Sequence, residues 1–242
     1  MSRPPNYLLR LPRRTWRDAF PPALRRWWSG MPQLALENTA AFLLPSLLPL
    51  RAQDRVLEIG CGTGALAHSL TERVPFLMPV VGTDTRAARL RRGAHTADIR
   101  LIQAAPTALP FPERHFTVIV VGHQIRDWED ESLARFLGEA WRVLTHNGVV
   151  LVWEVAPSRS PAVNAIWARL LAAPGRPPRL RSFAEIGHQA REAGFAWIQT
   201  LRLQPMLWPP GPRVAVLLLK EYYDAETVTL RPGETPDHRS LR

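Results

Sequence analysis

The segment VLEIGCGTGALAHSL, residues 56–70, constrains the fold of this chain more than any other. An apolar run typical of a buried strand leads into a glycine-rich turn, and small and apolar residues suited to a helix follow it. Glycine serves such a turn because it adopts positive φ angles and lets the backbone approach a ligand closely. A strand, loop and helix of this kind predicts a site for a nucleotide-like cofactor.

The glycines by themselves do not identify that cofactor. Gly60, Gly62 and Gly64 satisfy G-x-G-x-G, while Gly60, Gly62 and Ala65 satisfy the dinucleotide pattern G-x-G-x-x-G/A equally well. A dinucleotide and S-adenosylmethionine therefore both stay open. A phosphate loop is excluded because no Gly-Lys-Ser/Thr follows. Asp84, at the end of the next apolar run, could accept hydrogen bonds from an adenosine ribose, which suits either cofactor, or it could cap the helix that follows.

Apolar runs of strand length alternate with helical segments beyond the loop. The helix expected from residue 130 is the clearest, because its apolar residues recur at spacings of three and four. The strands are nearly continuous apolar runs, which is typical of a parallel sheet covered by helices on both faces. The pattern predicts an α/β, doubly wound domain with strands at 55–60, 79–84, 99–104, 115–122 and 148–155, and helices at 64–74, 85–94 and 130–146.

The pattern loosens after residue 155. Residues 156–181 contain five prolines around a short helical stretch and predict an excursion over one edge of the sheet. A helix capped by Ser182 and ending at Gly194 is expected next. Strands at 195–203 and 213–222 follow with too short a connection for a crossover helix, so this last pair must be antiparallel.

Charge and composition bear on the partners. The net charge of +10 arises from thirty arginines and a single lysine, and residues 1–31 alone carry +6. A bias so strongly toward arginine indicates genome composition more than nucleic-acid binding. Residues 1–50 are expected to form a basic arm and helices that cover the site, and the interleaved arginine and tryptophan could contact a membrane surface peripherally. The main α/β domain is expected to span 51–221, with the excursion at 156–181, and 222–242 is a polar tail.

The compartment is expected to be the cytoplasm. The lone cysteine, Cys61, excludes an intramolecular disulfide, and no run of about 18 apolar residues suggests a membrane span. The sequence indicates no metal site and no particular oligomeric state.

Several motifs occur in a recognisable order. Glu58-x-Gly-x-Gly-x-Gly is followed by LPFPERHFTVIVV and then by AWRVLTHNGVVLVWE. This order resembles the class I S-adenosylmethionine-dependent methyltransferases, most closely the branch of the ubiquinone and menaquinone C-methyltransferases, over about residues 36–221. The resemblance implies a Rossmann-like, seven-stranded, mostly parallel sheet with a reversed last strand. It also implies an enzyme that uses S-adenosylmethionine to methylate a small or lipid-like acceptor. A nucleic-acid acceptor is not expected, since no Asn-Pro-Pro-Tyr-like sequence follows the fourth strand.

The resemblance assigns roles by position. It places the methionine part of the cofactor on the loop from Gly60 to Gly64, supported by Glu58, and the ribose on Asp84. The remaining expected cofactor contacts are Cys61, Thr85, Ala105 and Gly122. Residues 121–127 would line the methyl-transfer pocket.

An oxygen or carbon nucleophile can require a base, and the segment VGHQIRDWED offers two candidates. These are His123 and Asp127. Each could instead be structural, His123 as a polar loop residue and Asp127 as a turn or cap residue.

One departure from the family pattern concerns adenine. Ala104, Ala105 and Pro106 stand where the family usually has Gly-Asp-Ala, so the carboxylate that accepts from the adenine amino group is absent and Pro106 has no N–H to donate. Losing both hydrogen bonds costs about 1–3 kcal/mol. The alternative interpretation is accordingly a non-catalytic, methyltransferase-like binding module.

Overall fold

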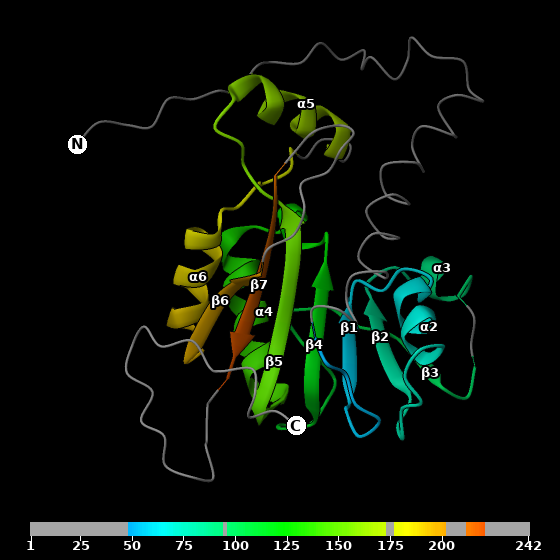
Figure 1. Ribbon diagram of the computed structural model, residues 1–242. Coiled ribbons are helices and arrows are strands. Elements are labelled where there is room, and N and C mark those ends of the chain that lie inside the picture. Colours follow the sequence, from blue (N-terminus) through cyan, green and yellow to red (C-terminus); the bar gives the residue numbers. More distant parts are fainter. Residues whose placement is uncertain (1–47, 94–95, 173–176, 202–211, 221–242) are drawn as a thin grey trace, which may run out of the picture.

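The computed structural model describes residues 48–93, 96–172, 177–201 and 212–220 (Figure 1). Most of the expected basic arm and the whole polar tail lie outside these residues. The described chain forms a seven-stranded sheet in the order β3-β2-β1-β4-β5-β7-β6. Its strands are β1 (Val56–Ile59), β2 (Val80–Asp84), β3 (Ile99–Gln103), β4 (Phe116–Gly122), β5 (Leu144–Val155), β6 (Trp197–Leu201) and β7 (Arg213–Leu219).

The sheet is parallel except at β7. The pairs β1–β2, β2–β3, β1–β4 and β4–β5 are parallel, whereas β7 runs antiparallel to both β5 and β6. The arrow of β7 points opposite to that of β4 in Figure 1. The predicted doubly wound sheet with a reversed last strand is therefore confirmed.

The helices are α2 (Ala65–Thr71), α3 (Ala87–Leu90), α4 (Asp130–Val143), α5 (Pro161–Leu171) and α6 (Phe183–Glu192). Helix α4 begins where its periodicity predicted, and α6 has the expected cap, since the Ser182 hydroxyl accepts from the Glu185 N–H while the Glu185 carboxylate accepts from the Ser182 N–H. None of the described helices is long and apolar enough to cross a membrane.

Two elements differ from their predicted extents. Helix α3 has only four residues, because Leu90 is its single buried residue and no apolar stripe extends it. Strand β5 begins four residues before the predicted start at 148, and its register against β4 shifts between Phe116 and Val118. This irregularity in the pairing accommodates the polar His146-Asn147 pair within the strand.

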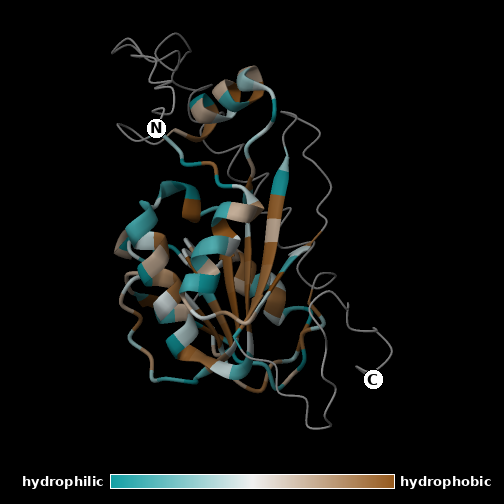
Figure 2. Cartoon of the chain, turned by 90° about the vertical axis from the view of Figure 1, so that its left-hand side faces the viewer, coloured by the Kyte–Doolittle hydropathy of each residue, from teal (hydrophilic) through white to brown (hydrophobic). Residues whose placement is uncertain are grey.

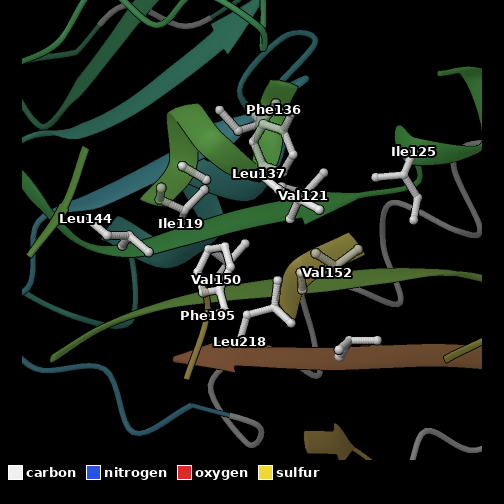
Figure 3. Close-up of a cluster of buried hydrophobic side chains, with 14 of the residues drawn as sticks. Ile119, Val121, Ile125, Phe136, Leu137, Leu144, Val150, Val152, Phe195 and Leu218 are labelled. Carbon is white, nitrogen blue, oxygen red and sulfur yellow. The ribbon is translucent and has the colours of Figure 1, made fainter. Parts of the chain in front are cut away.

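The sheet separates two hydrophobic clusters. The larger packs residues of β1, β4, β5 and β7 against α4 and α6. Figure 3 shows Ile119 and Val121 of β4 beside Leu137 and Phe136 of α4. The smaller packs the opposite face of β1, β2, β4 and β5 against Leu66, Ala67 and Leu70 of α2. Figure 2 shows the hydrophobic strands enclosed in this way.

Helix α5 lies beyond the carboxyl ends of β4 and β5 (Figure 1). It is the short helical stretch predicted within residues 156–181. Trp167 anchors it by packing on Val155, the last residue of β5, with Leu180 beside them. The helix is thus attached to the same edge of the sheet as the glycine loop.

Candidate functional site

The site lies at the carboxyl edge of the sheet. The chain winds outward from β1 to β2 and β3 on one side, and from β4 to β5 on the other. The strand order therefore reverses between β1 and β4, and the loops that leave these two strands diverge. Ligands of open α/β sheets bind in the crevice at such a point.

The glycine loop leaves β1 in a conformation that only glycine adopts readily. Gly60, Gly62 and Gly64 have φ angles of 74°, 59° and 81°. The N–H groups of Gly60 and Cys61 both donate to the Thr83 carbonyl oxygen at the end of β2, at 2.7 and 2.9 Å. Among the described residues other than its two neighbours in the chain, no atom lies within 4 Å of the position that a Cβ would take on Gly62. The loop is thus fixed at its base and open above Gly62.

Asp84 connects this loop to the next strand. Its buried carboxylate accepts from the Gly62 N–H at 3.0 Å through Oδ2 and from the Arg86 N–H at 2.8 Å through Oδ1. Arg89 Nη1 lies 3.8 Å from Oδ2. Asp84 therefore braces the loop and the first turn after β2, but it does not cap α3, whose N-cap is Arg86 without a side-chain cap hydrogen bond. Each carboxylate oxygen has a further lone pair for a ligand hydroxyl.

Glu58 and Cys61 are buried beside the loop. Glu58 Oε2 accepts from the Ala67 N–H at 3.2 Å, which places a negative charge at the start of α2. Burial, followed by the charges of Glu58 and Asp84, raises the pKa of Cys61 far above its ordinary value. Cys61 is thus a neutral packing residue and not a nucleophile.

The expected adenine end of the site contains a residue that the sequence analysis missed. Gln103, the last residue of β3, donates from Nε2 to the Thr85 carbonyl oxygen at 3.1 Å. The backbone of Ala104 is tied to the same turn by a 3.2 Å bond from its N–H to the Asp84 carbonyl oxygen. The Gln103 side-chain oxygen is an acceptor close to Thr85, and Ala105 follows two residues later.

A buried charged cluster occupies the ends of β4 and β5. His123 Nδ1 lies 3.3 Å from Glu154 Oε1, and Arg126 Nη1 donates to the same oxygen at 2.9 Å. All three residues are buried, Glu154 completely. Glu154 Oε1 also accepts from the Val155 N–H at 2.9 Å. His123 has a φ of 56°, which is uncommon for a residue other than glycine.

The environment keeps Glu154 ionised. Burial alone raises the pKa of a carboxyl, but the charge of Arg126, the hydrogen bond and charge of His123, and the Val155 N–H together lower the pKa of Glu154 to about 2. The sequence analysis missed Glu154 and Arg126. The signal available for Glu154 was a charged residue inside the nearly continuous apolar run GVVLVWEV, since buried acids are rare unless paired.

Asp127, the second candidate base, is placed differently. It ends the 3-10 helix η2 (Ile125–Asp127) and is exposed. Partial desolvation, opposed by the charge of Arg126, raises the pKa of its carboxyl. Within the described chain, the Asp127 carboxylate makes no hydrogen bond to His123. The structure therefore pairs His123 with Glu154 and not with Asp127.

Gly122 is required by packing at the end of β4. A Cβ on this residue would lie 2.5 Å from Trp153 Nε1 of β5. That indole N–H is buried and has no hydrogen-bond partner among the described residues. A ligand oxygen at this edge of the sheet could satisfy it.

The segment before α6 holds the η2 loop in place. The buried guanidinium of Arg181 donates to the carbonyl oxygens of Ile125 and Trp128 and to the carboxylate of Asp130. Arg179 N–H donates to the Arg126 carbonyl oxygen at 2.8 Å. No cluster of potential metal ligands occurs in the residues that the structure describes.

Glu154 provides a testable pH dependence. Since its pKa is about 2 in the folded protein against an ordinary 4.5, the unfolded state binds more protons between these values. Ionised Glu154 therefore stabilises the folded state fully above about pH 5, and this stabilisation is lost as the pH falls toward 2. Between pH 6 and pH 3.5, we expect the free energy of unfolding to fall by roughly 1 kcal/mol more in the wild type than in the double variant Glu154→Gln, Arg126→Met. Urea titrations at the two pH values measure it, and equal losses in both proteins would contradict the assignment.

Comparisons with known proteins agree with this geometry. Residues 56–148 match the family model for a methyltransferase domain. The demethylmenaquinone methyltransferase of Thermus thermophilus is 34% identical over 122 residues, which are 48% of this chain and 54% of that protein. The ubiquinone/menaquinone biosynthesis C-methyltransferase of Francisella philomiragia is 29% identical over 125 residues, 49% of each chain. The chain thus spans about half the length of the curated relatives it matches.

A solved structure supports the fold independently. The S-adenosylmethionine-dependent methyltransferase SibL in its apo form superposes with a TM-score of 0.69 at 20% identity, covering 84% of this chain and 60% of that one. Residues 56–148 are therefore similar to a methyltransferase domain, and the described chain shares the fold of this solved methyltransferase, including the seven-stranded sheet with a reversed β7.

Proposed function

We propose that this protein transfers a methyl group from S-adenosylmethionine to a small, lipid-like acceptor of the quinone type. The observation that carries the proposal is the glycine loop, which is fixed by Thr83 and Asp84 and open above Gly62. The names of the two curated relatives support a quinone-type acceptor.

The residues present fit this cofactor. The backbone of the loop can approach a methionine moiety most closely at Gly62, where the described side chains leave space, whereas the Gln124 side chain lies over Gly60. Asp84 retains acceptor capacity for ribose hydroxyls. The bound cofactor supplies both the methyl group and its leaving group, so the protein chiefly has to align the acceptor and exclude water.

Gln103 offers a replacement for the acid that is missing at the adenine end. With Nε2 committed to the Thr85 carbonyl, its oxygen is oriented as an acceptor at the end of β3. An amide oxygen there can accept from the adenine amino group, as the carboxylate does in the family pattern. The absence of an acid at Ala105 therefore does not by itself indicate a lost cofactor site.

Calorimetric titration with S-adenosylmethionine and S-adenosylhomocysteine tests the proposal. We expect micromolar dissociation constants for both ligands. Asp84→Ala should weaken binding by about tenfold or more, since it removes the charged acceptor and the brace on the Gly62 N–H. Asp98→Ala is the matched control, because Asp98 is exposed and precedes β3 at the opposite edge of the sheet.

Absence of ligand binding and an unchanged affinity in Asp84→Ala would contradict different parts of the proposal. Absence of binding at millimolar concentrations of either ligand would refute the proposal and favour the non-catalytic binding module. Equal affinity in Asp84→Ala and the wild type would refute only the ribose assignment.

A further inference from the structure

We propose that His123 is the general base for the methyl acceptor and that Glu154, held by Arg126, is the positioning residue that prepares it. The acceptor would give a hydroxyl proton to His123. This inference rests on the proposed function and adds to it the base and its supporting pair.

The first step of the argument is the tautomer of His123. Glu154 is ionised and can only accept, so the contact of 3.3 Å requires a proton on His123 Nδ1. In the neutral ring this leaves the lone pair on Nε2. Among the described residues, Nε2 has no hydrogen-bond partner. The nitrogen that can accept a proton is therefore also the one that the described part of the chain leaves without a hydrogen bond.

The second step is the backbone of His123. Its left-handed φ of 56° costs of order 1 kcal/mol and persists only where the surroundings impose it. The His123 N–H donates to the Trp153 carbonyl oxygen at 3.0 Å, which extends the β4–β5 ladder into the turn. The turn thereby directs the imidazole toward Glu154, the residue that follows Trp153. Strained positions of this kind occur preferentially at functional sites.

The third step is the role of Arg126. An isolated buried carboxylate would take up a proton and could then no longer fix the Nδ1–H tautomer. Arg126 prevents this by donating from Nη1 at 2.9 Å, and its own N–H lies 3.4 Å from Glu154 Oε2. The charge of Glu154 also adds to the desolvation that raises the pKa of the nearby Asp127 carboxyl, against the charges of Arg126, Arg86 and Arg89. Glu154 remains an anion that can stabilise an imidazolium.

The reaction step follows from this arrangement. The acceptor O–H gives its proton to His123 Nε2 as the acceptor forms its bond to the methyl carbon, and the bond from that carbon to the cofactor sulfur breaks. Glu154 stabilises the imidazolium, which then releases the proton to solvent. When the attacking atom is a ring carbon conjugated with the hydroxyl, that carbon loses its own hydrogen as a proton and the oxygen is reprotonated. One proton is released per methyl group in either case.

A spectroscopic test requires no acceptor. We expect the ring nitrogens of His123 in the wild type at pH 8, assigned with His123→Gln, to show a protonated Nδ1 and an unprotonated Nε2 by ¹⁵N NMR. Glu154→Gln combined with Arg126→Met should remove this preference. A proton on Nε2 in the wild type, in either the neutral or the cationic ring, would overturn the proposal.

A kinetic test uses reduced short-chain demethylmenaquinone as the probe and tritiated methyl transfer as the readout. Glu154→Gln should lower kcat by about 10²- to 10⁴-fold with little change in KM. Glu154→Gln leaves the buried positive charge of Arg126 without a carboxylate to balance it. The double variant with Arg126→Met removes that charge as well and should therefore recover stability. We expect its kcat to stay low. Recovery of kcat together with stability would show a purely structural pair and refute the proposal.

Chemical rescue tests His123 itself. His123→Gly suits the left-handed φ and leaves a space for added imidazole. We expect this variant to lose at least a hundredfold in kcat and to regain about tenfold or more with imidazole, while its affinity for S-adenosylhomocysteine stays unchanged. Asp54→Asn, before β1 at the opposite edge of the sheet, is the control and should retain wild-type kcat.

The outcomes separate this inference from the proposed function. A wild type that binds no cofactor refutes the proposed function. A wild type that binds cofactor but does not methylate the reduced probe refutes the quinone-type acceptor of the proposed function, and the ¹⁵N NMR measurement then still tests the base and its supporting pair. Full activity of His123→Gly without imidazole refutes the base.

Discussion

Replacing Gly60 by alanine is expected to weaken the binding of S-adenosylmethionine by roughly 30- to 100-fold. Two independent effects act at this position. The φ of 74° costs an L-residue about 1–2 kcal/mol, and a Cβ would lie 2.3 Å from Cδ of Gln124, whose side chain covers the loop. The backbone around Gly60 and the segment after β4 that carries Gln124 would both have to shift. The glycine loop would then lose the conformation that binds the cofactor.

Calorimetric titration of the variant measures this effect, and Gly138→Ala is the control. Gly138 is exposed within α4, has no atom within 4 Å of a would-be Cβ, and should gain about 0.5–1 kcal/mol of stability as alanine. Adding Gln124→Ala to Gly60→Ala removes the clash and leaves the backbone strain, so this double variant should recover part of the affinity. Wild-type affinity in a folded Gly60→Ala protein would show that the loop does not bind the cofactor.

Replacing Arg181 by methionine is expected to lower the free energy of unfolding by roughly 2–4 kcal/mol. The guanidinium is 4% exposed and satisfies the carbonyl oxygens of Ile125 and Trp128 as well as the carboxylate of Asp130. Methionine fills a similar volume but donates nothing, so polar atoms of the η2 loop lose their partner. The same loop carries Arg126, and a drop in kcat is therefore expected in addition.

Urea denaturation measures the change, with Arg179→Met as the matched control. Arg179 lies two residues away in the same segment, is 47% exposed, and pairs with the exposed Glu129 and Asp130. Exposed ion pairs contribute about 0–1 kcal/mol, so this variant should remain close to the wild type. Equal stability of the two variants would show that Arg181 does not hold the loop.

The fold was predictable to a large extent because local pattern and tertiary packing agree. Apolar runs predicted β1, β2 and β4, and the spacing of Leu133, Phe136 and Leu137 predicted α4. Helix α3 was predicted too long because arginine has a good helix propensity, whereas only the single buried Leu90 holds the turn against the sheet. The start of β5 was missed because it depends on irregular pairing with β4, which no local pattern records.

The candidate site likewise has a part that local sequence predicts and a part that depends on strand pairing. The sequence by itself determined the glycine loop, its dependence on positive φ, and the acid at the end of β2, because backbone freedom and strand position are local properties. Only the tertiary structure decided which base candidate has a partner. His123 and Glu154 are 31 residues apart and meet because β4 and β5 are neighbours, while Asp127, four residues from His123, turns to solvent. A sequence can show that a charged residue lies in a buried strand. Which residue it pairs with depends on which strands are neighbours, and the order of the strands is set by the packing of the whole sheet.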